Sequence, residues 1–294
     1  MPLSTIEIPL NYPKRVIRGL RHRCGSKHRI LCLHGWLDNA NSFKPMMPLL
    51  ADCDIVAIDF PGHGQSDHFA GAYSIANYAH HVLQAATQLG WDNFHLIGHS
   101  LGGCIAPFCA VADPKAITSL TLIDAAGPQS ETAEQLPARF TRFHQDQIYF
   151  RTNQSRVYES IDQAVESRLR ATRMAPESAR LIVERQLQQT DRGYQWRFDP
   201  LLRAASANYY TEEQVKAILA AIECPVQCIL ADNGYIVNKP DLNDRLACID
   251  ILDVATLPGQ HHLHMDTPEP VASIINQFLS KLDRNHKSVD PGVA

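Results

Sequence analysis

The chain has 294 residues, of which 45% are apolar and 20% are charged, and its formal net charge is −4. This length and composition are typical of a globular protein with one large core, with or without a smaller appended lobe. A mildly acidic chain offers no electrostatic support for binding nucleic acid or an anionic membrane surface. We therefore expect neither kind of partner and no association with membranes.

Two features of the chain bear on its location. The N-terminal segment has no basic head followed by a long apolar run, and no stretch approaches the ~18 apolar residues of a membrane span. Several of the eight cysteines lie inside apolar runs, where a free thiol behaves as a small buried hydrophobe. We expect a cytoplasmic protein with reduced cysteines, present as a monomer or a homodimer.

Short apolar runs alternate along the chain with helical patterns. Strands are expected at 29–33, 53–60, 93–98, 116–124, 225–231 and 249–255. Most of these runs are continuous, as is typical of strands covered on both faces of a parallel sheet. Helices are expected at 73–89, 101–112 and 268–282. The alternation predicts an α/β fold, with a mostly parallel sheet and helices on both faces.

The stretch 127–207 breaks this alternation. It is rich in Arg, Gln and Glu and contains no convincing strand. We interpret it as a helical cap inserted into a core formed by 1–126 and 208–294. Its aromatic residues could line an apolar pocket, although aromatics at such spacing are more often the core of a lobe.

The segment "LIGHSLGG" lies where a strand changes to a helix, and Gly98, Ser100 and Gly102 fit the pattern G-x-S-x-G. This pattern is typical of a sharp turn that exposes a serine nucleophile at the carboxyl end of a sheet. The alternative is a Gly/Ser-rich turn or a weak phosphate loop, but no Gly-Lys-Ser/Thr ending follows. The context favours a nucleophile.

A serine nucleophile needs a base. The loop "GQHHLHMD" offers His261, His262 and His264, at the sheet edge where the serine is expected. Three histidines with this spacing could instead hold a metal, but no Cys or Asp arrangement completes a site. We predict no metal and no cofactor.

The base must be oriented by a carboxylate, and the oxyanion of the transition state needs donors. Asp124 ends one predicted strand and Asp232 follows another, and the residues alone leave both open. The backbone N–H of Leu101, directly after the nucleophile, is one expected donor. The second is the N–H of Trp36, in the turn after the strand that ends at Leu33.

Together these motifs resemble the α/β-hydrolase superfamily over nearly the whole chain, and most closely the serine hydrolase-like proteins. The blocks "LHGWLDN", "DFPGHGQSD", "GHSLGG" and "GQHHLHMDTPEPVA" stand in the order of that superfamily. The resemblance implies an α/β-hydrolase fold with the cap after the sixth strand. It also implies that Ser100 is the nucleophile and His261 the base.

The chain departs from the superfamily at the acid. The usual acid position corresponds to Gly234, so the resemblance favours Asp124, after the sixth strand, with Asp232 as the alternative. We expect His34, Gly35 and His99 to contact the substrate.

The expected reaction is hydrolysis of a small or medium carboxylic ester through an acyl-enzyme. Amide, thioester or carbon–carbon hydrolysis on the same triad is an alternative. A ligand-binding, receptor-like protein with vestigial catalysis is another.

Overall fold

A single eight-stranded sheet forms the centre of the computed structural model, which describes residues 2–12, 14–153 and 156–289. The strand order is β1-β2-β4-β3-β5-β6-β10-β11. The strands from β3 onward in this sheet are parallel, while β1 and β2 form an antiparallel edge. Its strands are β1 (Ser4–Leu10), β2 (Arg15–Arg23), β3 (His28–Leu33), β4 (Cys53–Ile58), β5 (Phe94–His99), β6 (Ile117–Ile123), β10 (Val226–Asn233) and β11 (Leu252–Gln260).

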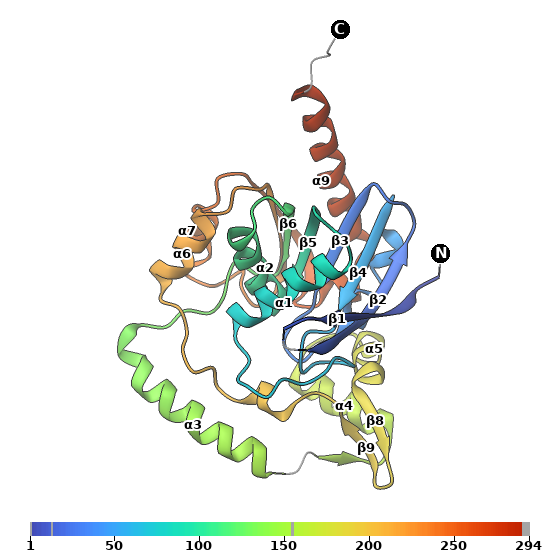
Figure 1. The fold of residues 1–294 in the computed structure, drawn as a ribbon, viewed down its shortest axis with the longest axis vertical. Helices are drawn as coiled ribbons and strands as arrows, with labels where there is room; N and C mark the ends of the chain where they lie inside the picture. The colour runs from blue at the N-terminus through green and yellow to red at the C-terminus, as the bar shows by residue number, and fades with distance from the viewer. Residues whose placement is uncertain (1, 13, 154–155, 290–294) are drawn as a thin grey trace.

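Helices surround this sheet and fill the cap (Figure 1). The α-helices are α1 (Ile75–Gln88), α2 (Leu101–Ala112), α3 (Leu136–Thr152), α4 (Ile161–Ala171), α5 (Pro176–Gln186), α6 (Glu212–Ala220), α7 (Leu242–Leu246), α8 (Leu263–Asp266) and α9 (Pro268–Val289). Short 3-10 helices are η1 (Ala40–Phe43), η2 (Met47–Leu49), η3 (Ala133–Gln135) and η4 (Pro200–Arg203).

The two faces of the sheet bury separate cores because successive strand residues point to opposite sides. In β3, Leu31 and Leu33 pack with apolar residues of α1, α2 and α6. The alternating residues Ile30 and Cys32 pack instead with η1, η2 and α9. Both faces of β3 are thus covered, as the continuous apolar runs predicted, and the α/β fold with a mostly parallel sheet is confirmed.

The six expected strands correspond to β3, β4, β5, β6, β10 and β11, and the three expected helices to α1, α2 and α9. The β1–β2 hairpin was not predicted, because its residues alternate between buried and exposed at the edge of the sheet and form no continuous apolar run. The helix expected to end at Leu282 continues to Val289, beyond the core (Figure 1).

The insertion between β6 and β10 contains α3, α4 and α5, as a helical cap requires, but also a small antiparallel sheet of order β7-β9-β8. Its strands are β7 (Val157–Tyr158), β8 (Leu187–Thr190) and β9 (Gly193–Trp196). The prediction of a strand-free insertion was therefore wrong. These strands are short and rich in Gln, Thr and Gly, so they lack the apolar pattern of a buried strand, and a cluster around Tyr158 stabilises them instead.

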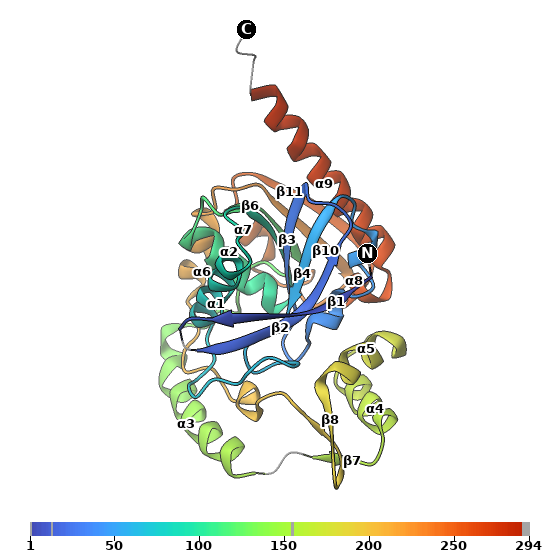
Figure 2. The same ribbon diagram turned by 45° about the vertical axis from the view of Figure 1, so that its right-hand side comes forward.

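The ends of the insertion lie side by side, since Ser130 and Tyr210 form an isolated parallel bridge. This bridge is close to the predicted boundaries at 127 and 207, but the division into a cap and a core of 1–126 and 208–294 stays a prediction. Figures 1 and 2 show α3 on one side of the cap and α4, α5 and β8 on the other.

Buried polar contacts hold the α4–α5 side of the cap to the core. Arg185 of α5 forms an ion pair with Asp59, with Nη2 2.8 Å from Oδ2, and both side chains are almost completely buried. Asn39, in the loop after β3, donates from Nδ2 to the carbonyl of Ile182 at 2.8 Å. This part of the cap is therefore fixed against the loop that carries Trp36.

Two observations concern the expected location. Within the described ranges, no helix is long and apolar enough to cross a membrane. The eight cysteines, all of which lie in those ranges, are free thiols.

Candidate active site

Ser100 lies in a strained turn between β5 and α2. Its φ of 50° and ψ of −111° put the backbone in a region that non-glycine residues rarely adopt. The turn is possible because Gly98 and Gly102 leave room: a Cβ on Gly102 would lie 2.0 Å from the carbonyl oxygen of Leu33. The Ser100 N–H donates to the carbonyl of Ile123 at 3.1 Å, which ties the turn to β6.

His261 follows β11 and pairs with Asp124, at the end of β6. The His261 Nδ1 atom lies 2.5 Å from Asp124 Oδ2, and the side chain of Asp124 is fully buried. A carboxylate only accepts at neutral pH, so Nδ1 carries the proton and Nε2 is left free to accept one. The His261 ring also lies 4.6 Å, between centroids, from the ring of His99, which directly precedes Ser100. The structure therefore brings the histidine loop to the edge of the sheet that carries the serine.

The backbone of the loop that follows β10 holds the Asp124 carboxylate in place. Its Oδ2 accepts from the Tyr235 N–H at 2.9 Å, and its φ is 45°. A Cβ on Gly234 would lie 2.3 Å from Asp124 Oδ1. The Asp124 carboxylate thus occupies the space that a side chain at position 234 would fill.

Asp232 takes a different position. It is exposed, and its Oδ1 accepts from the backbone N–H of Gly259 at 2.9 Å. That bond supports the start of the histidine loop. Of the two candidate acids, the structure brings Asp124 into contact with His261.

The two expected oxyanion donors border one cavity. Trp36 and Leu101 both line a cavity of about 100 Å³. Leu101 is the first residue of α2, so its N–H has no partner within the helix. The Trp36 indole Nε1 donates to the carbonyl of Leu202 at 2.8 Å, which anchors this loop to η4.

His34, Gly35 and His99 are not among the residues that line this cavity. The side chains of His34 and His99 are 0% exposed. His34 uses both ring nitrogens on backbone atoms: Nδ1 lies 2.7 Å from the Gly35 carbonyl, and Nε2 accepts from the Phe60 N–H at 2.9 Å. These placements differ from the substrate contacts predicted from the sequence, because a fully buried ring touches no bound molecule unless the site opens.

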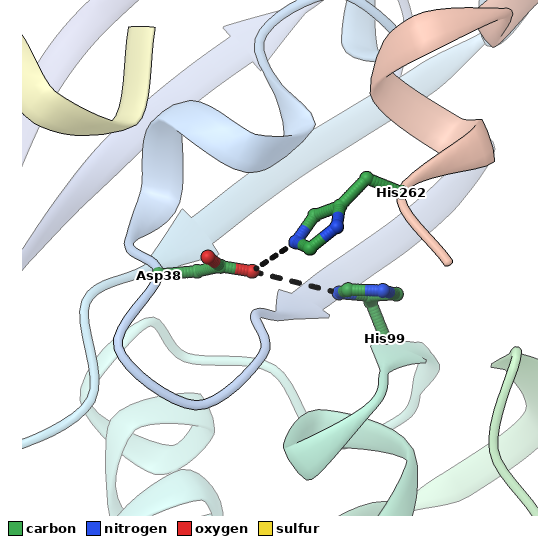
Figure 3. A group of neighbouring side chains, drawn as sticks. All are labelled: Asp38, His99 and His262. Carbon is green, nitrogen blue, oxygen red and sulfur yellow. Dashed lines mark hydrogen bonds and ion pairs between the residues drawn. The ribbon is translucent and has the colours of Figure 1, made fainter. Parts of the chain in front are cut away.

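Asp38, His99 and His262 form a buried polar cluster, and His99 directly precedes Ser100 in the chain (Figure 3). Asp38 Oδ2 lies 3.2 Å from His262 Nε2 and 3.7 Å from His99 Nδ1, and Asp38 Oδ1 accepts from Arg168 of α4 at 2.5 Å. Burial alone would raise the pKa of Asp38, but Arg168 and His262 outweigh it and hold that pKa well below its ordinary range. Burial and the neighbouring histidines lower the pKa of His99 far below 6.5. The cluster therefore combines an ionised carboxylate with a neutral imidazole.

Comparison with known proteins agrees with this geometry. The family model of the alpha/beta hydrolase fold matches residues 28–268. The chain belongs to the α/β-hydrolase family. It is 31% identical over 265 residues to a serine hydrolase-like protein of Danio rerio, an alignment that covers 85% of this α/β hydrolase and 81% of the relative. The resemblance found in the sequence is thereby confirmed, and the protein is a hydrolase of the serine hydrolase-like group.

Solved structures show the same fold. A hypothetical protein from Pseudomonas aeruginosa PAO1 is 33% identical, with a TM-score of 0.88 over 96% of this chain and 99% of its own. A thioesterase domain from the curacin biosynthetic pathway has a TM-score of 0.78 over 92% of this hydrolase and 99% of its own chain, at 23% identity. The second likeness establishes the fold alone.

Sequence reasoning missed two side chains at this site. The Tyr235 ring stacks on the His261 ring, with centroids 3.9 Å apart and planes at 18°. Arg168, from the cap, neutralises Asp38. Tyr235 follows the glycine at the usual acid position, a signal that could have found it, whereas nothing in the sequence near Arg168 points to a partner 130 residues away.

Proposed function

We propose that this hydrolase cleaves a small or medium carboxylic ester through an acyl-enzyme on Ser100, with His261 as base and Asp124 as the orienting acid. The observation that carries the proposal is the His261–Asp124 pair at 2.5 Å, beside the strained turn that presents Ser100. A buried carboxylate on Nδ1 and a serine in a strand–turn–helix motif are the parts that acyl transfer requires.

The reaction follows from these positions. The Ser100 hydroxyl attacks the ester carbonyl while His261 Nε2 takes its proton, and Asp124 stabilises the imidazolium that forms. The backbone N–H groups of Trp36 and Leu101 hold the oxyanion of the tetrahedral intermediate. The intermediate collapses to the acyl-enzyme, and the alcohol leaves with the proton from His261. Water, activated by His261, then releases the acid and restores Ser100.

The cavity beside the oxyanion donors supports a short acyl or alcohol group. At about 100 Å³ it is far smaller than the ~300–1,000 Å³ of pockets that hold drug-sized ligands. Ile75 and Tyr78 of α1 and Phe143 of α3 are among the residues that line it. We expect kcat/KM to be highest for acetyl to butyryl esters and to fall as the chain outgrows this space.

Covalent labelling tests the nucleophile. A fluorophosphonate probe should label the wild-type protein, and Ser100→Ala should remove the label without unfolding the chain. Ser206→Ala is a matched control and should keep the label, because this serine lines the cavity that Trp36 and Leu101 also line. Failure to label folded wild-type protein would contradict the proposal and favour a receptor-like protein with vestigial catalysis.

A panel of substrates then distinguishes ester hydrolysis from amide, thioester or carbon–carbon hydrolysis on the same triad. p-Nitrophenyl esters of increasing length should be hydrolysed with a clear preference for short chains. Equal or faster turnover of the matched thioesters or anilides would move the assignment to those substrates. A cytoplasmic location, and a monomeric or homodimeric state, stay predictions.

A further inference from the structure

Three side chains that could bind a metal ion lie close together in the core (Figure 3). Asp38, His99 and His262 come from the loop after β3, the end of β5 and the turn after β11. Their ligand atoms all lie within 4.8 Å of one another, and the three residues are 1%, 0% and 3% exposed. This clustering is distinct from the atoms that would react with substrate, which belong to Ser100 and His261.

His99 presents an unused lone pair to this cluster. Its Nε2 lies 2.9 Å from the carbonyl oxygen of His261, and a carbonyl only accepts, so Nε2 carries the proton. The neutral ring then has its lone pair on Nδ1, which points toward Asp38 and has no hydrogen-bond partner among the described residues. A lone pair and a carboxylate facing each other in a buried space repel, and a cation between them would satisfy both.

Gly35 keeps the space between these two atoms open. A Cβ at position 35 would lie 2.7 Å from Asp38 Oδ2 and 3.0 Å from His99 Nδ1. Any larger residue would therefore fill the gap between the two ligand atoms. Gly35 therefore leaves the space between the two ligand atoms unfilled.

His99 and Asp38 also have the supporting contacts that orient metal-binding side chains. Ligating histidines usually donate their second ring N–H to a carbonyl or carboxylate, as His99 does to the carbonyl of His261. Ligating carboxylates are usually hydrogen-bonded in turn, as Asp38 is to Arg168. His262 lacks such support, since its Nδ1 has no partner in the described part of the chain.

We propose that Asp38, His99 and His262 form a binding site for a transition-metal dication of the Zn²⁺ type, and that occupancy inhibits the hydrolase. Two imidazoles and one carboxylate suit such ions, and three protein ligands leave a fourth position open. Zinc–ligand bonds of about 2.0–2.2 Å place tetrahedral ligand atoms about 3.3–3.6 Å apart. The Asp38–His262 distance of 3.2 Å lies just below this range and the Asp38–His99 distance of 3.7 Å lies just above it, so each needs only a small shift.

Inhibition follows from how the site is coupled to His261. His99 holds the carbonyl of His261, and the centroids of the two rings are 4.6 Å apart. A dication bound to His99 opposes the positive charge that His261 acquires in the transition state. It also pulls on the hydrogen bond that positions the His261 backbone. Metal binding itself does not depend on the proposed ester chemistry.

Cobalt titration of the metal-free protein tests the binding site. Co²⁺ should bind in a 1:1 ratio and give the visible d–d bands of a four-coordinate ion. His262→Gln should weaken this binding by about 10- to 100-fold or more, whereas the surface control His80→Gln should leave it unchanged. Ser100→Ala should bind Co²⁺ as the wild type does, which separates this result from any failure of the proposed catalysis.

Activity measurements test the coupling. Ester hydrolysis by the wild type should fall with the same midpoint as the cobalt bands appear and should recover on chelation. His262→Gln, compared with its own metal-free rate, should resist inhibition at these concentrations. Cobalt bands without loss of activity would overturn the inhibitory role.

X-ray absorption of the zinc-loaded wild type avoids variants that fail to fold. It should show two imidazoles with oxygen ligands and no sulfur. Zinc–sulfur scattering, which would place the ion on the free cysteines, would overturn the site. Equal Co²⁺ binding by the wild type and a folded His262→Gln would overturn it as well.

Discussion

Replacing Asp124 with asparagine separates the charge of the acid from its shape. Asp124 Oδ2 accepts from His261 Nδ1 at 2.5 Å and from the Tyr235 N–H at 2.9 Å, while Oδ1 faces the Ala231 N–H at 3.5 Å. The amide oxygen of an asparagine should take the Oδ2 place, where two donors converge. The amide NH₂ group then faces the more distant Ala231. His261 keeps its tautomer, and the variant loses mainly the negative charge.

The expected loss of activity follows from the loss of this negative charge. A carboxylate in contact with the ring stabilises the imidazolium of the transition state by about 1.4–4 kcal/mol. Asp124→Asn should therefore lower kcat/KM by about 10- to 1000-fold, with the effect in kcat rather than KM. A drop near 10⁴-fold would instead indicate that the amide has turned and reversed the tautomer of His261.

The assay is steady-state hydrolysis of p-nitrophenyl acetate, with circular dichroism to confirm folding. Asp232→Asn is the matched control, because this carboxylate is exposed and contacts the Gly259 N–H rather than His261. It should stay within about threefold of the wild type. Near wild-type activity in Asp124→Asn, together with a large loss in Asp232→Asn, would refute the assignment of the acid.

Three further predictions follow from the same geometry. Gly234→Ala should sharply reduce esterase activity, because its Cβ would lie 2.3 Å from Asp124 Oδ1. The double variant Asp124→Ala/Gly234→Asp should be more active than Asp124→Ala alone, and equal activity would argue that the two acid positions are not interchangeable. Arg185→Met should destabilise the protein by about 3–5 kcal/mol in urea unfolding, because it leaves the buried carboxylate of Asp59 without its ion-pair partner. Arg185→Met/Asp59→Asn should recover part of the lost stability, and an unchanged unfolding midpoint in the single variant would contradict the role of the pair. The free energy of unfolding should also fall as the pH falls below about 6.5, by up to about 1.4 kcal/mol per pH unit for each buried histidine. The reason is that histidines of the unfolded chain then bind protons, whereas the buried histidines of the folded protein stay neutral. Guanidinium unfolding between about pH 7.5 and 5.5 measures this dependence, and a stability that stays constant or rises as the pH falls would contradict it. The histidines whose pKa burial lowers well below the ordinary 6.5 are His63, His99 and His264.

Two physical signals explain the parts of the fold that were predictable from the sequence. β3 and β4 are buried on both faces, so their apolar runs are continuous, and the glycines around Ser100 mark a turn that few other residues permit. The β8–β9 hairpin gave neither signal, because its residues are exposed or only partly buried and a tyrosine–tryptophan cluster stabilises it.

The site was predictable only where a local motif marks a residue. Ser100 and the histidine loop lie in such motifs, and Asp124 follows a recognisable strand. The cluster of Asp38, His99 and His262 was not predictable, because three segments far apart in the chain create its 3.2 Å and 3.7 Å contacts. No spacing within the histidine loop encodes a partner at Asp38.

A crystal structure of the protein after reaction with a small alkyl phosphonate tests the central claim most directly. We expect phosphorus bonded to Ser100 Oγ, with the phosphoryl oxygen about 2.7–3.1 Å from the backbone nitrogens of Trp36 and Leu101. The alkyl group should enter the cavity beside Ile75 and Phe143, and His261 should remain paired with Asp124. Phosphorus on another residue, or a phosphoryl oxygen turned away from both nitrogens, would contradict the account.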